Sequence, residues 1–259
     1  MATMTERTLL ITGASRGIGA ATAVLAARHG WNVALNYRTE AATAESVAAE
    51  VRALGRQART YAADVADEAA VRAMFERIEV EMPPLRGLVN NAGVVDRQAR
   101  LDQMDVARWR RMFEVNVIGT LLCAQLAVRR MSSLHGGAGG AIVNVSSVAA
   151  TLGSPGWYVD YAASKGAIDT FTVGLARELA TEGVRVNAVR PGIIDTDIHA
   201  SGGAPDRARQ SVPLIPMRRP GHAQEIAQAI VWLLSDDASY TTGAILDGLK
   251  ARGLLDDTI

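Results

Sequence analysis

The sequence has few of the residues that build disulfide frameworks or metal centres. It contains one cysteine, Cys123, and four histidines in 259 residues. A disulfide within the chain is therefore impossible. Cys123 lies in the apolar run TLLCAQLAV without a neighbouring histidine or basic residue, so we interpret it as a small buried side chain rather than a nucleophile. Because no histidines, cysteines or acids have the spacing of metal ligands, we expect no metal.

Net charge and long apolar runs are also lacking. Lys and Arg together number 27, as do Asp and Glu, so the formal net charge is zero. A nucleic-acid-binding protein would carry a basic stripe, and we expect no nucleic-acid partner. No apolar run approaches the ~20 residues of a membrane-spanning helix, and the opening MATMTERTLLITG does not resemble a signal peptide. We expect no membrane partner and a cytoplasmic location.

What the sequence does contain is a regular alternation of short apolar runs and helical patterns. The runs predict strands at 8–12, 32–37, 58–64, 85–93, 141–147, 183–192 and 244–247. The helical patterns between them cover 17–30, 40–54, a stretch ending near 80, 103–114, 116–132, 158–182 and 222–235. Strands without alternation that are separated by helices indicate a parallel sheet covered on both faces. The pattern predicts an α/β fold, a doubly wound parallel sheet of about seven strands, in a single domain over 1–259, with 195–220 forming a long loop or short helices over a site.

The glycine-rich stretch TGASRGIG at 12–19 joins the first predicted strand to the first predicted helix. Gly13, Gly17 and Gly19 would let the backbone approach a ligand closely, and the helix that follows offers free N–H groups. A parallel-sheet protein binds a pyrophosphate in this way. The spacing G-x-x-x-G-x-G differs from the commoner G-x-G-x-x-G, and a tight turn that needs glycine for packing is the alternative interpretation.

The end of the second predicted strand indicates which dinucleotide would bind. An acidic residue at this point would hydrogen-bond the ribose 2′-hydroxyl of NAD, but WNVALNYRT at 31–39 contains neither Asp nor Glu. It contains Arg38, and the glycine-rich turn contains Arg16. Two guanidinium groups suit a 2′-phosphate, so we expect NADP(H) to be favoured over NAD(H). The alternative is that both arginines are solvated surface residues.

The stretch WYVDYAASKGAI at 157–168 contains two tyrosines and one lysine. Tyr161 and Lys165 are four positions apart and would share one face of a helix, whereas Tyr158 has Ala162 in that position. An ammonium at ~4 Å would favour the phenolate by up to ~4 kcal/mol at an effective dielectric near ~20. That would bring a phenol with an ordinary pKa near ~10 into the range of an acid or base at neutral pH. An exposed helix pair is the alternative.

The motifs occur in one order along 8–247: TGASRGIG, NNAG at 90–93, Asn116, IVNVSS at 142–147, YAASK at 161–165 and RPG at 190–192. Together they resemble the short-chain dehydrogenase/reductase family, and the surrounding sequence resembles bacterial oxidoreductases related to 3-oxoacyl-carrier-protein reductases and glucose dehydrogenases. The resemblance implies a Rossmann-type fold. It also implies NADPH-dependent hydride transfer between nicotinamide and a small-molecule carbonyl compound or secondary alcohol.

The resemblance assigns roles to four residues. Tyr161 would be the general acid or base, and Lys165 would lower its pKa and bind the nicotinamide ribose. Ser147 would orient the substrate carbonyl, with Ser146 left as the alternative because the stretch before Tyr161 is one residue longer than usual. Asn116 would kink its helix and hold a water of the proton relay to Lys165.

The resemblance also implies which residues contact the cofactor. They come from the glycine-rich turn, the ends of the strands and the segment at 191–196: Gly13, Ser15, Arg16, Gly17, Ile18, Gly19, Arg38, Asp64, Val65, Asn90, Ala92, Gly93, Tyr161, Lys165, Pro191, Gly192, Ile194 and Thr196. The expected substrate pocket is formed by Val94, Val95, Ser154, Trp157, Tyr158 and the segment 196–216. His199 is interpreted as a surface residue.

Three questions stay open at this stage. The substrate could be a β-ketoacyl thioester, a sugar, a steroid or a xenobiotic carbonyl compound. The C-terminal tail at 248–259 departs from the family pattern, in which this part borders a subunit interface; a homotetramer is expected, with a dimer as the alternative. The chain could also be a non-catalytic NADP-binding regulatory protein of the same fold, although the presence of Asn116, Ser147, Tyr161 and Lys165 argues against this.

Overall fold

The protein is built on one parallel sheet in the order β3-β2-β1-β4-β5-β6-β7. The computed structural model describes residues 6–196, 202–204 and 206–248. The strands are β1 (Thr8–Ile11), β2 (Asn32–Tyr37), β3 (Ala58–Ala62), β4 (Leu85–Asn90), β5 (Gly140–Val145), β6 (Val184–Pro191) and β7 (Ile245–Gly248). The predicted doubly wound sheet of about seven parallel strands is confirmed.

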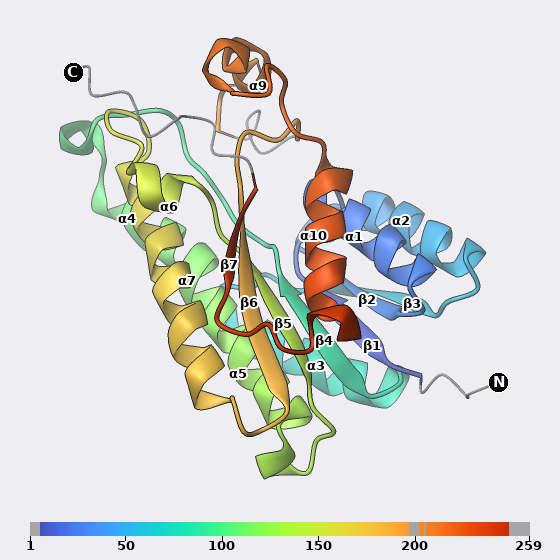
Figure 1. Cartoon of the computed structure of the whole chain (residues 1–259). Coiled ribbons are helices and arrows are strands. Elements are labelled where there is room, and N and C mark those ends of the chain that lie inside the picture. The colour runs from blue at the N-terminus through green and yellow to red at the C-terminus, as the bar shows by residue number, and fades with distance from the viewer. Residues whose placement is uncertain (1–5, 197–201, 205, 249–259) are drawn as a thin grey trace.

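Helices cover both faces of the sheet (Figure 1). One face carries α1 (Gly17–Arg28), α2 (Ala41–Ala53) and α10 (Ala223–Leu234); the other carries α3 (Glu68–Glu81), α5 (Gly119–Met131) and α7 (Val159–Glu178). Successive strand residues alternate between the two layers: Leu9 and Ile11 belong to the core under α1 and α10, and Leu10 belongs to the opposite core. Since both faces are buried, the strands are apolar without a break, as the sequence shows.

The order of the strands fixes where a site can form. The chain runs from β1 outward to β3 and then returns to β4 on the other side of β1. The loops that leave β1 and β4 therefore diverge, and a crevice opens between them at the carboxyl ends of the strands. The glycine-rich turn follows β1 directly and reaches this crevice.

The structure departs from the predicted helices around Asn116. Between α4 (Val106–Phe113) and α5 the chain makes a π-helical turn over Glu114–Ile118. A π turn holds one extra residue and is common at functional sites. The structure also contains a short helix that the sequence did not predict, α6 (Ala149–Leu152), and the short helix α9 (Arg207–Gln210) in the segment 195–220, where the sequence predicted a loop or short helices. The α9 helix lies beyond the carboxyl end of the sheet, at the top of Figure 1.

Within the described ranges, one helical stretch, Val106–Met131, is long and apolar enough to cross a membrane by length and composition alone. Half of its most apolar window is buried in the fold. Cys123, Leu126 and Met131 of this stretch lie in the core beneath α3 and α7. A central helix of a packed domain has the same properties.

Candidate active site

A cavity of about 630 Å³ opens at the carboxyl ends of the strands. Its walls come from the glycine-rich turn, the loops after β2, β3 and β4, the end of β5, the first turns of α7 and the segment 191–196. A cavity of this size can bury most of a small organic ligand. Segments far apart in the sequence thus form one continuous pocket.

The glycine-rich turn is held by backbone geometry that only glycine tolerates. Gly13 and Gly17 have φ angles of +61° and +57°. A β carbon at Gly19 would lie 2.5 Å from the carbonyl oxygen of Gly13, so this residue is required for packing. The Asn91 amide nitrogen donates hydrogen bonds of 2.9 Å to the carbonyl oxygens of both Thr12 and Gly13. Asn91, which the sequence analysis missed, therefore ties the loop after β4 to the turn.

The predicted cofactor residues fall into two groups. Gly19 and Asn90 do not line the cavity, whereas the other sixteen of the eighteen do. Asn90 is buried in the sheet, where its amide nitrogen donates to Asn144 Oδ1 at 2.9 Å. Because β4 ends at Asn90, the next residue, Asn91, is the one that reaches the cavity. In the sequence, the doublet Asn90-Asn91 signalled that an asparagine lies at the cavity. The end of β4 decides which of the two reaches it.

The ribose end of the cavity contains both expected arginines, Arg16 and Arg38. Arg38 Nη1 lies 3.8 Å from Asp64 Oδ2, and the Arg38 side chain is 59% exposed, so it is free to turn toward a ligand. The sequence analysis missed Glu40, whose carboxylate lines the same end of the cavity. Arg16, Arg38 and Glu40 therefore line the end of the cavity where a dinucleotide would place its adenosine ribose.

Tyr161, Ser147 and Lys165 converge on the opposite end of the cavity. The Ser147 hydroxyl hydrogen-bonds the Tyr161 phenol. The Ser146 hydroxyl instead donates to the Lys165 carbonyl oxygen at 3.3 Å, facing the backbone of α7. The structure therefore separates the two candidate serines: Ser147 faces the phenol, and Ser146 faces the helix.

Burial affects the ionisation of both Tyr161 and Lys165. Burial raises the pKa of Tyr161, while the Ser147 hydrogen bond and the positive charge of Arg207 lower it. Burial also lowers the pKa of Lys165 to about 8, with the Asp169 carboxylate acting in the opposite direction. Lys165 Nζ donates to the Val145 carbonyl oxygen at 2.8 Å and lies 5.7 Å from the centroid of the Tyr161 ring.

The expectation that Lys165 lowers the pKa of Tyr161 stays a prediction. Ser147 and Arg207 lower the pKa of the phenol in this structure, and burial outweighs both. Burial also lowers the pKa of Lys165, because it disfavours the charged form of the ammonium. The sequence argument did not include the desolvation of either group.

Asn116 lies at the centre of the π turn and is completely buried. Its Oδ1 accepts from the Val94 backbone N–H at 2.8 Å, and its Nδ2 donates to the Val94 carbonyl oxygen at 3.0 Å and to Ser164 Oγ at 3.1 Å. A β carbon at Gly93 would lie 3.4 Å from Asn116 Oδ1 and 3.6 Å from Lys165 Nζ. The irregular helix predicted at Asn116 is therefore present, while the relay water stays a prediction.

The comparisons with known proteins agree with this geometry. The family model described as "Enoyl-(Acyl carrier protein) reductase" matches residues 13–247. The uncharacterized oxidoreductase YgfF of Escherichia coli (strain K12) is 53% identical over 238 residues, which are 92% of this chain and 96% of that one. The chain belongs to the short-chain dehydrogenase/reductase family. It is thus an NAD(P)-dependent enzyme that acts on CH–OH or C=O groups.

Two further relatives have informative descriptions. The cis-4-hydroxycyclohexanecarboxylate dehydrogenase of Sinomonas cyclohexanicum is 40% identical over 241 residues, covering 93% of this chain and 94% of that one. A short-chain dehydrogenase of Burkholderia cenocepacia J2315, solved in complex with NADP, superimposes with a TM-score of 0.84 at 34% identity, covering 94% of this chain and 96% of that one.

The residues of this short-chain dehydrogenase/reductase fit a dinucleotide. The positive φ angles at Gly13 and Gly17 expose backbone N–H groups at the start of α1, where a helix binds phosphate. A β carbon at Gly17 would lie 3.4 Å from the Thr196 side chain, so glycine at this position keeps the space between the turn and Thr196 open. Throughout the described ranges, no three His, Cys, Asp or Glu side chains are grouped to hold a metal ion.

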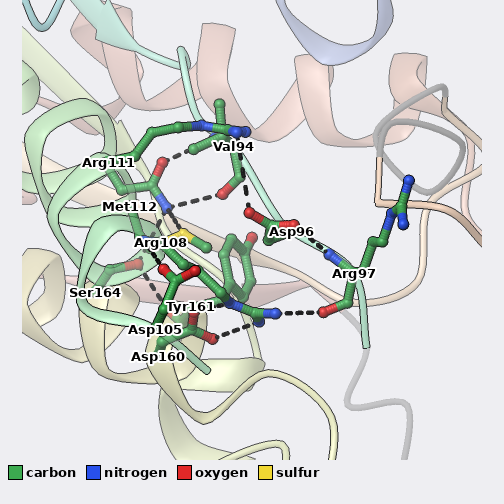
Figure 2. Close-up of polar contacts among 11 residues, drawn as sticks. Val94, Asp96, Arg97, Asp105, Arg108, Arg111, Met112, Asp160, Tyr161 and Ser164 are labelled. Carbon is green, nitrogen blue, oxygen red and sulfur yellow. Dashed lines mark hydrogen bonds and ion pairs between the residues drawn. The ribbon is translucent and has the colours of Figure 1, made fainter. Parts of the chain in front are cut away.

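The loop 94–100, of which Val94 and Val95 line the cavity, is fixed at several points. Asn116 binds Val94, the Ala99 N–H donates to the Trp157 carbonyl oxygen at 3.1 Å, and Arg108 Nη1 donates to the Arg97 carbonyl oxygen at 2.6 Å. Figure 2 shows Arg108 between this carbonyl and the Asp160 carboxylate, beside Tyr161.

Arg108 and Asp160 form a two-pronged buried ion pair. Arg108 Nε and Nη2 donate to the two Asp160 carboxylate oxygens at 2.6 and 3.1 Å, and the side chains are 10% and 3% exposed. The Asp160 hydrogen bond raises the pKa of Arg108. Because Asp160 directly precedes Tyr161, the pair connects α4 and the loop 94–100 to the first turn of the tyrosine helix.

The expected substrate-side residues Val94, Val95, Ser154, Trp157 and Tyr158 all line the cavity. From the expected segment 196–216, Thr196, Arg207, Ser211 and Leu214 line it as well. His199 and the atypical tail at 249–259 lie outside the described residues.

Arg108→Met should lower the free energy of unfolding by about 3–5 kcal/mol, because it leaves the Asp160 carboxylate buried without a partner. Urea denaturation measures this loss. Arg72→Met is the matched control, since Arg72 pairs with Glu68 at 2.7 Å on the exposed surface of α3, where such a pair contributes about 0.3–0.5 kcal/mol. Equal losses in the two variants would contradict the buried-pair interpretation.

Proposed function

We propose that the protein is an NADP(H)-dependent carbonyl reductase, or a secondary-alcohol dehydrogenase in the reverse direction, with Tyr161 as the general acid or base. The hydrogen bond between Ser147 and Tyr161 carries the proposal, because it sets two hydroxyl groups side by side in the cavity that also contains the glycine-rich turn. Two adjacent donors are what a carbonyl oxygen needs as negative charge develops on it.

Residues of the chain supply the proton that the substrate carbonyl oxygen takes up during reduction. Tyr161 keeps its proton at neutral pH because burial raises its pKa. Ser147 and Tyr161 donate hydrogen bonds to the substrate carbonyl oxygen, and Tyr161 transfers its proton to that oxygen as the bond order falls. When bound, the nicotinamide supplies the hydride. Lys165, with a pKa of about 8, can regain or release a proton near neutral pH, and Asn116 would hold the connecting water.

Binding energy at the glycine-rich turn and the ribose end would orient the cofactor. Gly13, Ser15, Gly17 and Ile18, which line the cavity, would surround the pyrophosphate, and Arg16 and Arg38 would bind the 2′-phosphate. The solved relative in complex with NADP supports this choice. Pro191, Gly192, Ile194 and Thr196, which also line the cavity, would border the nicotinamide.

The substrate is a small-molecule carbonyl compound or alcohol. The pocket beside Tyr161 is walled by aromatic and aliphatic side chains, among them Trp157, Tyr158 and Leu214. Such walls suit a compact carbon skeleton better than a sugar, whose hydroxyl groups would need many partners. One relative is named for an alicyclic hydroxycarboxylate, which is a substrate of this kind.

Tyr161→Phe should lower kcat for ketone reduction by at least about 100-fold, because it removes the group that supplies the proton. NADPH binding, measured by fluorescence titration, should stay within a few-fold of the native value. Tyr158→Phe is the matched control: it removes the neighbouring hydroxyl and keeps the buried ring, so turnover should persist. If Tyr158→Phe abolishes turnover and Tyr161→Phe does not, the assignment is wrong.

The rate of alcohol oxidation should rise with pH through the alkaline range, since the base form of Tyr161 is needed and burial raises its pKa. Ser147→Ala removes a hydrogen bond that lowers this pKa, so the midpoint should move to higher pH. A hydrogen bond of about 1 kcal/mol corresponds to about 0.7 pH units. Ser146→Ala should leave the midpoint in place. A shift caused by Ser146→Ala alone would reverse the choice of serine.

Arg38→Ser should weaken NADPH binding by about 10- to 100-fold, as loss of a charge-assisted hydrogen bond implies, and leave NADH binding nearly unchanged. Isothermal titration with both cofactors measures the two constants. Arg72→Ser, on the exposed surface of α3, controls for loss of a surface charge. Tighter binding of NADH than of NADPH by the native protein would refute the proposed preference for NADP(H).

The protein should be a homotetramer. Exposed apolar side chains occur on two separate parts of the surface: Val106, Phe113 and Ile118 along α4 and the π turn, and Trp232, Tyr240 and Leu246 beside the edge strand β7. Two different self-complementary patches generate a tetramer with dihedral symmetry. Light scattering should give the mass of four chains, and the mass of one chain would contradict the proposal.

A further inference from the structure

Arg207 extends from α9 into the substrate side of the cavity. Its guanidinium carbon lies 4.7 Å from the centroid of the Tyr158 ring and 5.4 Å from that of Trp157. Its positive charge lowers the pKa of Tyr161. The guanidinium therefore lies in the part of the pocket where a substrate would sit, near the hydroxyl that the proposed function uses.

Among the described residues, none neutralises the charge of Arg207. Across the described ranges no carboxylate forms an ion pair with it, and its Nε is buried without a hydrogen-bond partner. Its neighbours on the same side are paired, Arg108 with Asp160 and Arg111 with Asp96 at 3.9 Å. Partial burial of a cation without a counter-charge carries a cost, and contact with two aromatic rings offsets only part of it.

An anionic ligand would remove this imbalance. The Nη groups of the planar guanidinium present hydrogens that match the two oxygens of a carboxylate. The Trp157 and Tyr158 rings lie against it, and Leu214 lines the same cavity. One cation among apolar walls fits a singly charged group on a carbon skeleton, whereas a phosphate with about −1.5 to −2 charge needs further donors.

We propose that Arg207 binds a carboxylate of the substrate, so that the protein acts on oxocarboxylates and hydroxycarboxylates. This inference rests on the proposed reductase function. The substrate would be held at two points, with its carboxylate on Arg207 and its carbonyl oxygen at Ser147 and Tyr161. A bound carboxylate would also offset the effect of Arg207 on Tyr161, raise the pKa of the phenol and favour its protonated form.

The test compares acids with their neutral esters: 4-oxocyclohexanecarboxylate and 4-oxopentanoate against their methyl esters, with NADPH. The native protein should show a kcat/KM at least about 10-fold higher for one of the acids than for its ester. Arg207→Gln should lower that value by about 10- to 100-fold, mainly through KM, and lower kcat/KM for the ester much less. Arg207→Lys, which keeps the charge, should recover part of the loss.

Arg209→Gln is the matched control on the same short helix. Arg209 is 87% exposed and lies 3.9 Å from Asp206, so its loss should leave the preference for acids intact. If native protein reduces acids and esters equally well, or if Arg207→Gln weakens both equally, the carboxylate assignment is wrong and the reductase function stands.

A binding measurement separates the inference from the proposed function. Isothermal titration of the NADPH complex with cyclohexanecarboxylate and with cyclohexanecarboxamide requires no turnover. Preferential binding of the acid, lost in Arg207→Gln, supports the carboxylate site even if every ketone in the panel is inert, a result that would refute the reductase instead. Equal binding of acid and amide, or tighter binding of phenyl phosphate than of benzoate, would overturn the inference.

Discussion

The buried side chain of Asn116 joins the three segments on which the site depends. Its amide holds both backbone polar groups of Val94, at the start of the substrate-side loop, and reaches Ser164 on the tyrosine helix. The π turn is what brings this side chain into position between them. Since each buried donor and acceptor is paired only in this arrangement, displacing any one segment leaves a polar group unsatisfied, which fixes Tyr161 relative to the loop.

Burial has a second consequence for the site, which is electrostatic. It raises the pKa of Tyr161 and lowers the pKa of Lys165 to about 8, so both groups resist ionisation. Ser147 and Arg207 act in the opposite direction on the phenol. The working state of Tyr161 is therefore a balance between desolvation and two neighbours, one of which faces the substrate. A ligand that neutralises Arg207 would change that balance.

The local features of the sequence predicted the fold and much of the cavity. Apolar runs between helical patterns determine a parallel sheet, and the spacing of Tyr161 and Lys165 determines a shared helix face. Long-range partners were beyond this reasoning: Arg108 and Asp160 are separated by 52 positions. The choice of Asn91 over Asn90 depends on where β4 ends. The sequence placed the irregular segment 196–216 at the pocket, but only the folded chain shows that Arg207 is a residue of this segment that reaches the cavity.

The central claim is that Tyr161 donates a proton to the substrate. Its most direct test measures proton uptake together with NADPH oxidation. In a weakly buffered solution with a pH indicator, native protein, NADPH and 4-oxocyclohexanecarboxylate should take up one proton for each NADPH oxidised, because the substrate oxygen must be protonated. In Tyr161→Phe both signals should disappear together. If Tyr161→Phe oxidises NADPH and takes up protons at the native rate, Tyr161 is not the proton donor and the account of this site is wrong.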